Sequence, residues 1–316
     1  MKKPIAFLNL IRWKNLVVLI LAQGFLHFMI IQKLVFAVGV ELPLRYYQLG
    51  ILILSTVLIA AAGNIFNDIT DIKVDKINKP KEVIIGQFIK VKTAIFWAWM
   101  FNGIGFALAL ILSYQLQLIQ LALIHVMVIL LLKRYSESFK NKVLVGNLLI
   151  ALFTGLSIFL VYLYNLVSII NDPIIFVGLQ KQLPFIFNLS SAYVFFAFLS
   201  NLIREITKDA EDIEGDEIFG IQTFSVAYGT EKAVLLMRSL NAFLAISLSY
   251  FVYYSFKMNW IYLAVYLIVA VLIPVFYFEW TARKAKLKTD FMDLSFLSKI
   301  IMLAGILSMQ VFSLQF

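Results

Sequence analysis

The sequence contains no cysteine and only two histidines among its 316 residues. Without cysteine the chain can form no disulfide, no thiolate metal site and no cysteine nucleophile. Both histidines, His27 and His125, lie within apolar runs. A single imidazole in such a place more often packs or hydrogen-bonds than binds a metal. These shortages argue against zinc chemistry and against a fold held by covalent cross-links.

Charged residues are also scarce, at 14% of the chain, while 62% of the residues are hydrophobic and the mean hydropathy is +0.91. Soluble domains carry about 25% charged residues. A water-soluble core cannot bury this much apolar surface, so much of it must face lipid. The net charge of +9 is then explained by basic loops at the membrane rather than by nucleic acid.

The hydrophobic residues form nine segments that approach or exceed the length of a spanning helix. The segments are 16–36, 46–66, 93–113, 115–132, 143–165, 184–203, 233–256, 259–279 and 295–315. Almost no polar sequence separates the third from the fourth, which predicts a tight helical hairpin. We therefore predict an all-α membrane protein with about nine transmembrane helices in a single domain, residues 1–316.

Basic residues divide the connecting segments into two groups. The N-terminal segment, with Lys2 and Lys3, and the segments after the second, fourth, sixth and eighth helices hold 21 of the 27 Lys and Arg residues. The remaining connections hold only Arg45, Lys181 and Lys257. Since basic loops stay in the cytoplasm, the N-terminus is predicted to be cytoplasmic and the C-terminus to lie on the other side.

Acidic residues cluster in two segments of the same predicted side, which hold 12 of the 18. After the second helix, Asn67, Asp71 and Asp75 are spaced by four, so a helix would place them on one face. After the sixth helix, Asp212 and Asp216 repeat this spacing. Like charges at this spacing repel each other unless a cation lies between them.

The ligand types point to a particular cation. Oxygen ligands without His or Cys favour Mg²⁺ or Ca²⁺, and Mg²⁺ is commonly held by one or two carboxylates together with substrate phosphates. The two acidic segments therefore predict a clamp for a magnesium-bridged diphosphate. Two solvated charged loops with coincidental spacing are the alternative interpretation.

At these residues the sequence resembles the UbiA superfamily of intramembrane prenyltransferases. The family patterns match Asn67-Asp68-x-x-Asp71-x-x-x-Asp75 and Asp212-x-x-x-Asp216. The segments Arg12–Asn15 and Tyr135–Asn147 resemble further family patterns, so the resemblance covers nearly the whole chain. It implies helices around a central cavity with both acidic motifs at its cytoplasmic mouth. It also implies Mg²⁺-dependent transfer of a prenyl group, geranylgeranyl or longer, from a diphosphate to a lipid-soluble acceptor.

The stretch from Arg204 to Asp216 resembles members that prenylate geranylgeranylglycerol phosphate, which implies a glycerol phosphate acceptor and an ether product. Chlorophyll synthases share part of this pattern, so an aromatic or quinone-precursor acceptor such as 4-hydroxybenzoate or homogentisate remains open. One departure is the stretch before Gly86, where Glu82 and Val83 replace a basic residue of the family.

The resemblance and the spacing together assign roles to individual residues. Asn67, Asp71 and Asp75 are expected to hold one metal ion, and Asp212 and Asp216 the other. Asp68 and Asp209 are candidate acceptor-activating carboxylates, and Tyr135 is a candidate aromatic ring facing the allylic carbocation. The candidate substrate-binding residues are Asn15, Lys79, Lys81, Lys140, Arg204 and Lys208.

A transporter is the main non-enzymatic alternative. Transport sites lie near the bilayer midplane on broken helices. Here the carboxylates cluster at one predicted face, with none in the middle of a predicted helix and only Glu279 near the end of one. The sequence therefore favours an enzyme of the cell membrane that crosses it several times and carries its active-site loops in the cytoplasm.

This topology can be tested because the chain has no cysteine of its own. A single cysteine in place of Lys79 should resist an impermeant thiol reagent added outside intact cells, since its loop is predicted to be cytoplasmic. A cysteine in place of Lys181 should react. Labelling at position 79 from outside would contradict the orientation.

Overall fold

The computed structural model describes residues 3–315, so Lys2 lies outside the described residues. Apart from one isolated bridge between Ile85 and Ile89, the regular structure of these residues is helical. In chain order the helices are α1 Lys3–Leu10, α2 Trp13–Phe25, η1 Leu26–Ile31, α3 Gln32–Phe36, α4 Tyr46–Thr70, α5 Ile72–Asn78, α6 Val91–Gln115, α7 Leu121–Glu137, η2 Phe139–Asn141, α8 Val145–Ile170, α9 Pro173–Leu179, α10 Leu183–Glu211, α11 Ile213–Ile218, α12 Phe224–Tyr228, α13 Thr230–Lys257, α14 Ile261–Tyr266, η3 Leu267–Leu272, α15 Ile273–Ala282 and α16 Lys288–Ser313.

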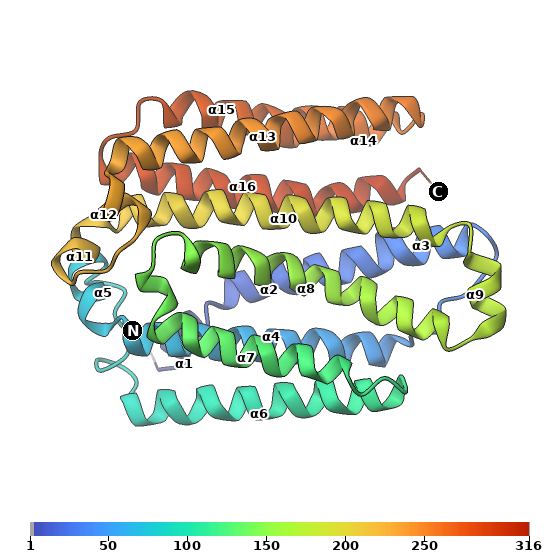
Figure 1. Cartoon of the computed structure of the whole chain (residues 1–316), viewed down its shortest axis with the longest axis horizontal. Helices are drawn as coiled ribbons and strands as arrows, with labels where there is room; N and C mark the ends of the chain where they lie inside the picture. Colours follow the sequence, from blue (N-terminus) through green and yellow to red (C-terminus); the bar gives the residue numbers. More distant parts are fainter. Residues whose placement is uncertain (1–2, 316) are drawn as a thin grey trace.

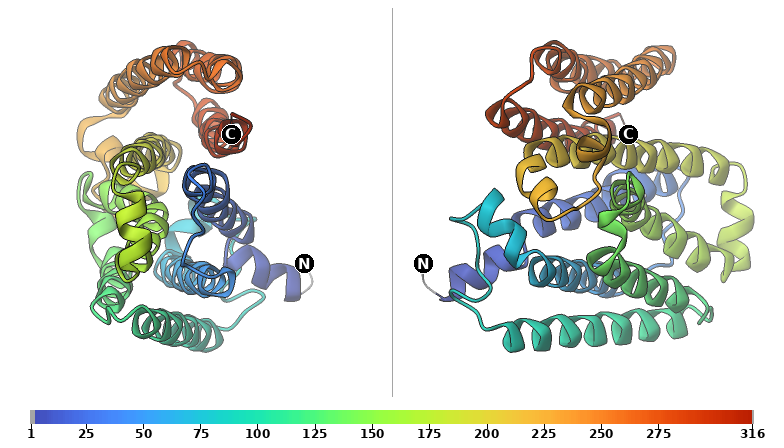
Figure 2. Two further views of the ribbon diagram at one scale, coloured as in Figure 1. Left: turned by 90° about the vertical axis from the view of Figure 1, so that its right-hand side faces the viewer. Right: turned by 60° about the vertical axis from the view of Figure 1, so that its left-hand side comes forward.

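The prediction of an all-α membrane protein is confirmed. Eight helical runs within residues 3–315 are long and apolar enough to cross a membrane. They are Trp13–Phe36, Tyr46–Thr70, Val91–Gln115, Val145–Ile170, Leu183–Glu211, Thr230–Lys257, Ile261–Ala282 and Lys288–Ser313. The long helices lie side by side, with the short helices α5, α11 and α12 at one end and α9 at the other (Figures 1 and 2).

The predicted fourth span, 115–132, is wrong at its start. Helix α6 continues to Gln115, and a turn that includes Gln117 at φ 55° leads into α7 at Leu121. Helix α7 has 17 residues and is shorter than the eight spans. The hairpin between α6 and α7 is present, but a ninth crossing and the cytoplasmic N-terminus remain predictions.

Two of the spans contain a turn of π-helix, η1 in the first and η3 in the seventh. The segment η3 ends at Leu272, two residues before Pro274. Proline has no N–H to donate to the carbonyl four residues earlier, so an ordinary α-helix cannot pass through this position unchanged. Local π-turns of this kind are a known way for a helix to accommodate an interruption and are frequent at functional sites.

Polar side chains inside the helices hydrogen-bond across the interior. Gln23 donates to the carbonyl of Ser157 at 2.7 Å and accepts from the Thr56 hydroxyl at 2.8 Å. Asn165 donates to Nδ1 of His27 at 3.2 Å. Intramembrane polar groups are expected to find partners within the bundle, because lipid offers none. His27 therefore takes part in helix packing.

Helices α4 and α6 approach each other closely at Gly105. Ser55 Oγ donates to the Gly105 carbonyl at 2.7 Å. A Cβ added at Gly105 would lie 2.9 Å from Ile59 Cγ1 and 3.1 Å from the Ser55 carbonyl oxygen. Small residues at such crossings allow the backbones of membrane helices to pack directly.

Gly105→Ala should therefore lower the midpoint of thermal unfolding in detergent, because the added methyl group overpacks this crossing at a cost of about 1–3 kcal/mol. Gly103→Ala is a matched control on the same helix, since a Cβ added at Gly103 would have no neighbouring atom within 4 Å. The control should be neutral or slightly stabilising. Equal midpoints for the two variants would contradict the close packing of α4 on α6.

Candidate active site

The first acidic motif lies at the junction of α4 and α5. Asp71 separates the two helices, with φ −92° and ψ 2°, a sparsely populated region where many active-site residues are found. The expected continuous helix is therefore broken at Asp71. Asn67, Asp71 and Asp75 nevertheless keep their helical spacing. The Asp71 N–H donates to the Asn67 carbonyl at 3.0 Å, and the Asp75 N–H donates to the Asp71 carbonyl at 2.8 Å.

The second motif has the same construction at the junction of α10 and α11. Asp212 separates these helices with φ −97° and ψ 7°. Its N–H bonds the Lys208 carbonyl at 2.9 Å, and the Asp216 N–H bonds the Asp212 carbonyl at 3.2 Å. The two junctions thus repeat one local backbone geometry, each with a carboxylate at the bend. Gly215 lies within α11.

Asn78, at the end of α5, joins the two junctions. Its Nδ2 donates to the Asp212 carbonyl at 2.9 Å, and its Oδ1 accepts from the Gly215 N–H at 2.9 Å. A Cβ at Gly215 would lie 2.5 Å from Asn78 Oδ1, so only glycine leaves room for this amide. Lys288 Nζ also donates to the Asn78 carbonyl at 3.0 Å. These contacts hold α5 against α11 and bring the two motifs together.

Two lysines neutralise the carboxylates at the bends. Lys79 Nζ lies 2.6 Å from Asp212 Oδ2 and 3.9 Å from Glu211 Oε1. Lys140 forms an ion pair with Asp71 and donates to Thr70 Oγ1 at 2.7 Å. Burial alone would lower the pKa of Lys79, but Asp212 and Glu211 hold it above its ordinary value. Two of the predicted substrate-binding lysines therefore lie at the acidic motifs, each paired with a bend carboxylate.

Some oxygen atoms of the two motifs have no hydrogen-bond partner and could bind a cation. Asn67 donates its amide to Asp71 Oδ2 at 2.8 Å, while Asn67 Oδ1 and Asp212 Oδ1 are buried without a hydrogen-bond partner. Burial and nearby Asp71 and Asp68 raise the pKa of Asp75 to about 6. Burial and nearby Asp212 and Asp71 raise the pKa of Asp216 to about 7. Buried oxygens and mutually repelling carboxylates are what a hard cation would stabilise.

Within residues 3–315, no three His, Asp or Glu side chains converge as a ready-made metal site. This arrangement fits Mg²⁺ better than a metal that needs a full protein cage. Mg²⁺ usually keeps several waters and takes only one or two carboxylates, with substrate phosphates completing its shell. The donor set of Asn67, Asp71, Asp75, Asp212 and Asp216 is suited to that mode.

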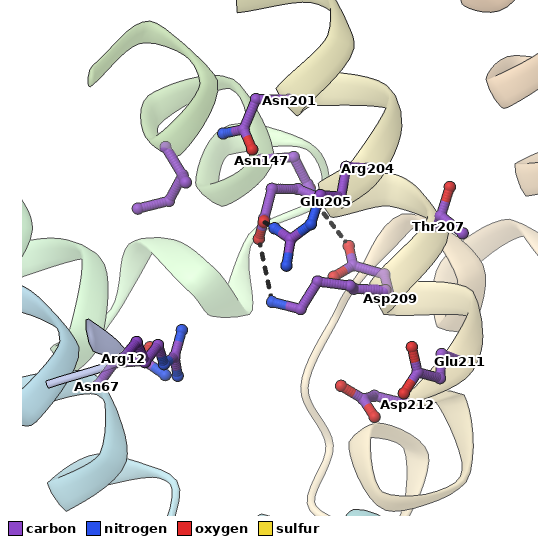
Figure 3. Close-up of polar contacts among 12 residues, drawn as sticks. Arg12, Asn67, Asn147, Asn201, Arg204, Glu205, Thr207, Asp209, Glu211 and Asp212 are labelled. Carbon is purple, nitrogen blue, oxygen red and sulfur yellow. Dashed lines mark hydrogen bonds and ion pairs between the residues drawn. The ribbon is translucent and has the colours of Figure 1, made fainter. Parts of the chain in front are cut away.

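Asp68 and Asp209 lie beside the motifs and have partners of their own. Asp68 Oδ1 accepts from Arg12 Nη2 at 2.9 Å, and Asp209 Oδ2 accepts from Asn147 Nδ2 at 2.8 Å. Arg12 occupies the break between α1 and α2 with φ 54°, a strained backbone for a non-glycine residue. In Figure 3, Arg12 and Asn67 lie opposite the labelled residues of α10 and Asp212 at the bend.

Arg204 and Lys208 are not isolated cations. Both pair with Glu205, at 2.6 Å and 3.4 Å respectively (Figure 3). One carboxylate thus serves two cations and leaves a net positive charge at this position. Lys81, by contrast, is exposed, and the structure of residues 3–315 records no ion pair for it.

Five of these residues, Arg12, Asn67, Arg204, Glu205 and Lys208, line a cavity of about 460 Å³. Its polar wall includes Asn15, Tyr135, Arg204, Lys208 and Lys299. Its deeper wall is mostly apolar and includes the side chains of Ile59, Val128, Phe153, Phe196, Met302 and Met309. The volume falls within the usual range for ligand pockets. The cavity can hold an apolar chain whose charged head remains at the acidic motifs.

Four residues of this site were not assigned from the sequence. Arg12 and Asn147 were visible only as parts of family-like stretches, and Asn78 as part of a polar loop. Lys299 lies on α16 and lines the cavity opposite α10. A lysine in the interior of an apolar segment was the available signal, because such residues usually mark function.

The paired acidic junctions, their lysines and the enclosed apolar cavity define a membrane protein built to hold a charged head and a hydrocarbon chain together. A model of the UbiA prenyltransferase family matches residues 25–300. The chain belongs to this family of membrane prenyltransferases, as its motifs predicted.

Curated relatives are similar over most of the chain. Digeranylgeranylglyceryl phosphate synthase from Methanosphaera stadtmanae is 30% identical over 249 residues, covering 78% of this chain and 81% of the relative. The synthase of the same name from Sulfurisphaera tokodaii is 31% identical over 205 residues, covering 65% of this chain and 66% of the relative.

Solved structures show the same fold. The structure described as "Structural and mechanistic insights into the biosynthesis of Digeranylgeranylglyceryl phosphate synthase in membranes" matches with a TM-score of 0.64 and 23% identity, over 100% of both chains. A UbiA homolog from Archaeoglobus fulgidus bound to DMAPP and Mg²⁺ matches with a TM-score of 0.56 and 17% identity, over 96% of this chain and 99% of that one.

The raised pKa values generate a prediction about Mg²⁺ and pH. A carboxylate whose pKa is raised by folding takes up a proton more readily in the folded state, so the metal-free protein gains stability from Asp216 and Asp75 as the pH falls through about 7 and 6. Mg²⁺ competes with those protons. Added Mg²⁺ should therefore raise the unfolding midpoint more at about pH 8 than at about pH 5.5.

The measurement is thermal unfolding in detergent with and without Mg²⁺ at both pH values. Asp216→Asn is the control, since it cannot take up a proton in this range and should lose part of the pH dependence. An equal stabilisation by Mg²⁺ at both pH values would contradict metal binding at these carboxylates.

Proposed function

We propose that this chain transfers a polyprenyl group, geranylgeranyl or longer, from its diphosphate to the hydroxyl of a prenylated glycerol phosphate in a Mg²⁺-dependent reaction that forms an ether. The observation that carries the proposal is the joining of the two acidic junctions by Asn78, together with a largely apolar cavity whose lining includes Asn67 of the first motif. The names of the curated relatives support the glycerol phosphate acceptor.

Donor activation is assigned to the acidic junctions and their lysines. Asn67, Asp71 and Asp75 would hold one Mg²⁺, and Asp212 and Asp216 the other. The ions supply positive charge that stabilises the departing diphosphate. Lys79 and Lys140, which pair with Asp212 and Asp71, would bind the diphosphate oxygens when those carboxylates hold Mg²⁺.

The reaction itself breaks the bond between the allylic carbon and the diphosphate oxygen and forms a bond from that carbon to the acceptor oxygen. The hydroxyl proton passes to a carboxylate, for which Asp68 and Asp209 are the candidates. Tyr135 lines the cavity and can present its ring to the positive carbon. The apolar wall excludes water, which would otherwise capture the carbocation.

A phosphate on the acceptor requires cations beyond those that meet the diphosphate. Arg204, Lys208 and Lys299 line the cavity, and within residues 3–315 Glu205 is the carboxylate that forms ion pairs with the first two. Asn15 lines the same cavity and can hydrogen-bond a substrate oxygen. An aromatic acceptor would need fewer cations here. This excess of charge favours the glycerol phosphate.

The orientation proposed for the enzyme follows its charge distribution. We place α7 as a ninth crossing and the end that carries α5 and α11 in the cytoplasm, because most basic residues lie on the connecting segments of that side. The membrane is proposed to be the cell membrane. Both substrates can then reach the cavity from lipid while Mg²⁺ and diphosphate exchange with the cytoplasm.

The acceptor assignment predicts a separable effect of Lys299. Purified enzyme with Mg²⁺ and geranylgeranyl diphosphate should form an ether product with geranylgeranylglycerol phosphate and none with 4-hydroxybenzoate. Lys299→Gln should raise the KM for the phosphate acceptor about tenfold, the lower range for losing a hydrogen bond to a charged group, with little change in the KM for the donor.

Lys286→Gln, at an exposed lysine away from the cavity lining, is the matched control and should leave both KM values unchanged. Product from the aromatic acid alone would refute the glycerol phosphate assignment. An unchanged acceptor KM in Lys299→Gln would remove that lysine from the acceptor site.

A further inference from the structure

A second cavity, of about 430 Å³, lies between α10, α13, η3 and α16. It is lined mainly by apolar and aromatic side chains, among them Phe185, Leu189, Leu248, Phe251, Leu267 and Val271. Its polar groups are hydroxyls and one amide, and no charged side chain of residues 3–315 lines it. This lining suits a hydrocarbon chain and would be a poor environment for a phosphate or a metal ion.

The second cavity adjoins the first across a thin wall. Tyr193, Phe196 and Gly305 line both cavities. The Phe196 ring lies directly on Gly305, so that a Cβ at position 305 would be 2.1 Å from Phe196 Cε1. The Tyr193 hydroxyl lies 3.2 Å from Ser308 Oγ. Glycine at 305 therefore gives the Phe196 ring the space it occupies between the two cavities.

The same two helices connect this wall to the cations at the mouth. On α10, Arg204 is eight residues from Phe196, which corresponds to about 12 Å along the helix axis. On α16, Lys299 is six residues from Gly305, or about 9 Å. A molecule whose phosphate rests on Arg204 and Lys299 would thus extend its chain toward Phe196 and Gly305.

The proposed reaction needs room for two long chains, and this step rests on the proposed function. The donor's head lies at the acidic junctions, so its chain takes the central cavity from the side of α4. We propose that the second cavity holds the polyisoprenoid chain of the acceptor, which crosses the wall at Phe196 and Gly305. The Phe196 side chain must change rotamer to admit it.

In this arrangement the affinity for the acceptor depends on the length of its chain. An acceptor with a single isoprene unit would end before the wall and gain nothing from the second cavity. A geranylgeranyl chain would bury additional apolar surface there. The second cavity should therefore affect the KM of the long acceptor and leave that of the short one unchanged.

The test fills the second cavity from a residue that does not line the first. Leu248 on α13 is buried and lines only the second cavity, so Leu248→Trp should obstruct it. Ile246→Trp is the matched control, because Ile246 is 68% exposed on the outer face of the same helix. Ser247→Phe, at a half-buried lining residue, is a milder obstruction should Leu248→Trp fail to fold.

The assay measures KM and kcat for glycerol phosphate acceptors that carry either a geranylgeranyl chain or one isoprene unit, with geranylgeranyl diphosphate as donor. The obstructed variants should show at least about a tenfold higher KM for the long acceptor, the loss expected when about two methylene groups stay unburied. Their KM for the short acceptor, and both KM values of Ile246→Trp, should match the wild type.

Three other outcomes would overturn the inference. Unchanged KM values for the long acceptor in the obstructed variants would mean that bulk membrane lipid occupies the second cavity. Equal losses for both acceptors would indicate general damage to the active site. If the wild-type enzyme uses neither acceptor, the proposed function itself is refuted. That result requires no variant, so it can be told apart from a failure of the inference about the second cavity.

Discussion

The hydrogen bonds from one side-chain amide, that of Asn78, are the constraint on which the candidate active site depends. They tie the end of α5 to the bend before α11, and glycine at position 215 leaves the amide its room. The two acidic bends are 141 positions apart in sequence, from Asp71 to Asp212, yet this contact holds their segments together. Within residues 3–315 no three carboxylates or imidazoles gather around one point, so a metal ion held at either bend would need substrate phosphates to complete its ligands.

Charge balance explains how so many carboxylates remain near one another before substrate arrives. Lys79 and Lys140 neutralise the two bend carboxylates, and Arg12 neutralises Asp68. Buried charges without partners are costly, so removing one member of any of these pairs would destabilise the folded enzyme. If Mg²⁺ were held by these carboxylates, Lys79 and Lys140 would be free to bind phosphate oxygens. The two lysines would then neutralise carboxylates before the substrate binds and phosphate oxygens afterwards.

Much of this arrangement could be predicted from the sequence because it depends on local spacing. Residues four apart, as in Asn67 and Asp71, face the same way whether or not the helix bends between them. The Asn78 contact and the pairing of Lys79 and Lys140 with the bend carboxylates depend on segments brought together only by folding. Lys299 was missed because its importance comes from the facing helix α10, and the short α7 was misplaced because apolar sequence continues through its preceding turn.

The most direct test of this account is pyrophosphate release from geranylgeranyl diphosphate by Asp71→Ala, by Asp212→Ala and by the double variant, in the presence of Mg²⁺ and acceptor. Asp293→Ala, at an exposed carboxylate, is the matched control. If the two bends hold one metal-bridged diphosphate, each single change abolishes turnover in a protein that still folds, and the double variant is no worse than either. Turnover retained in either single variant would contradict the joint site.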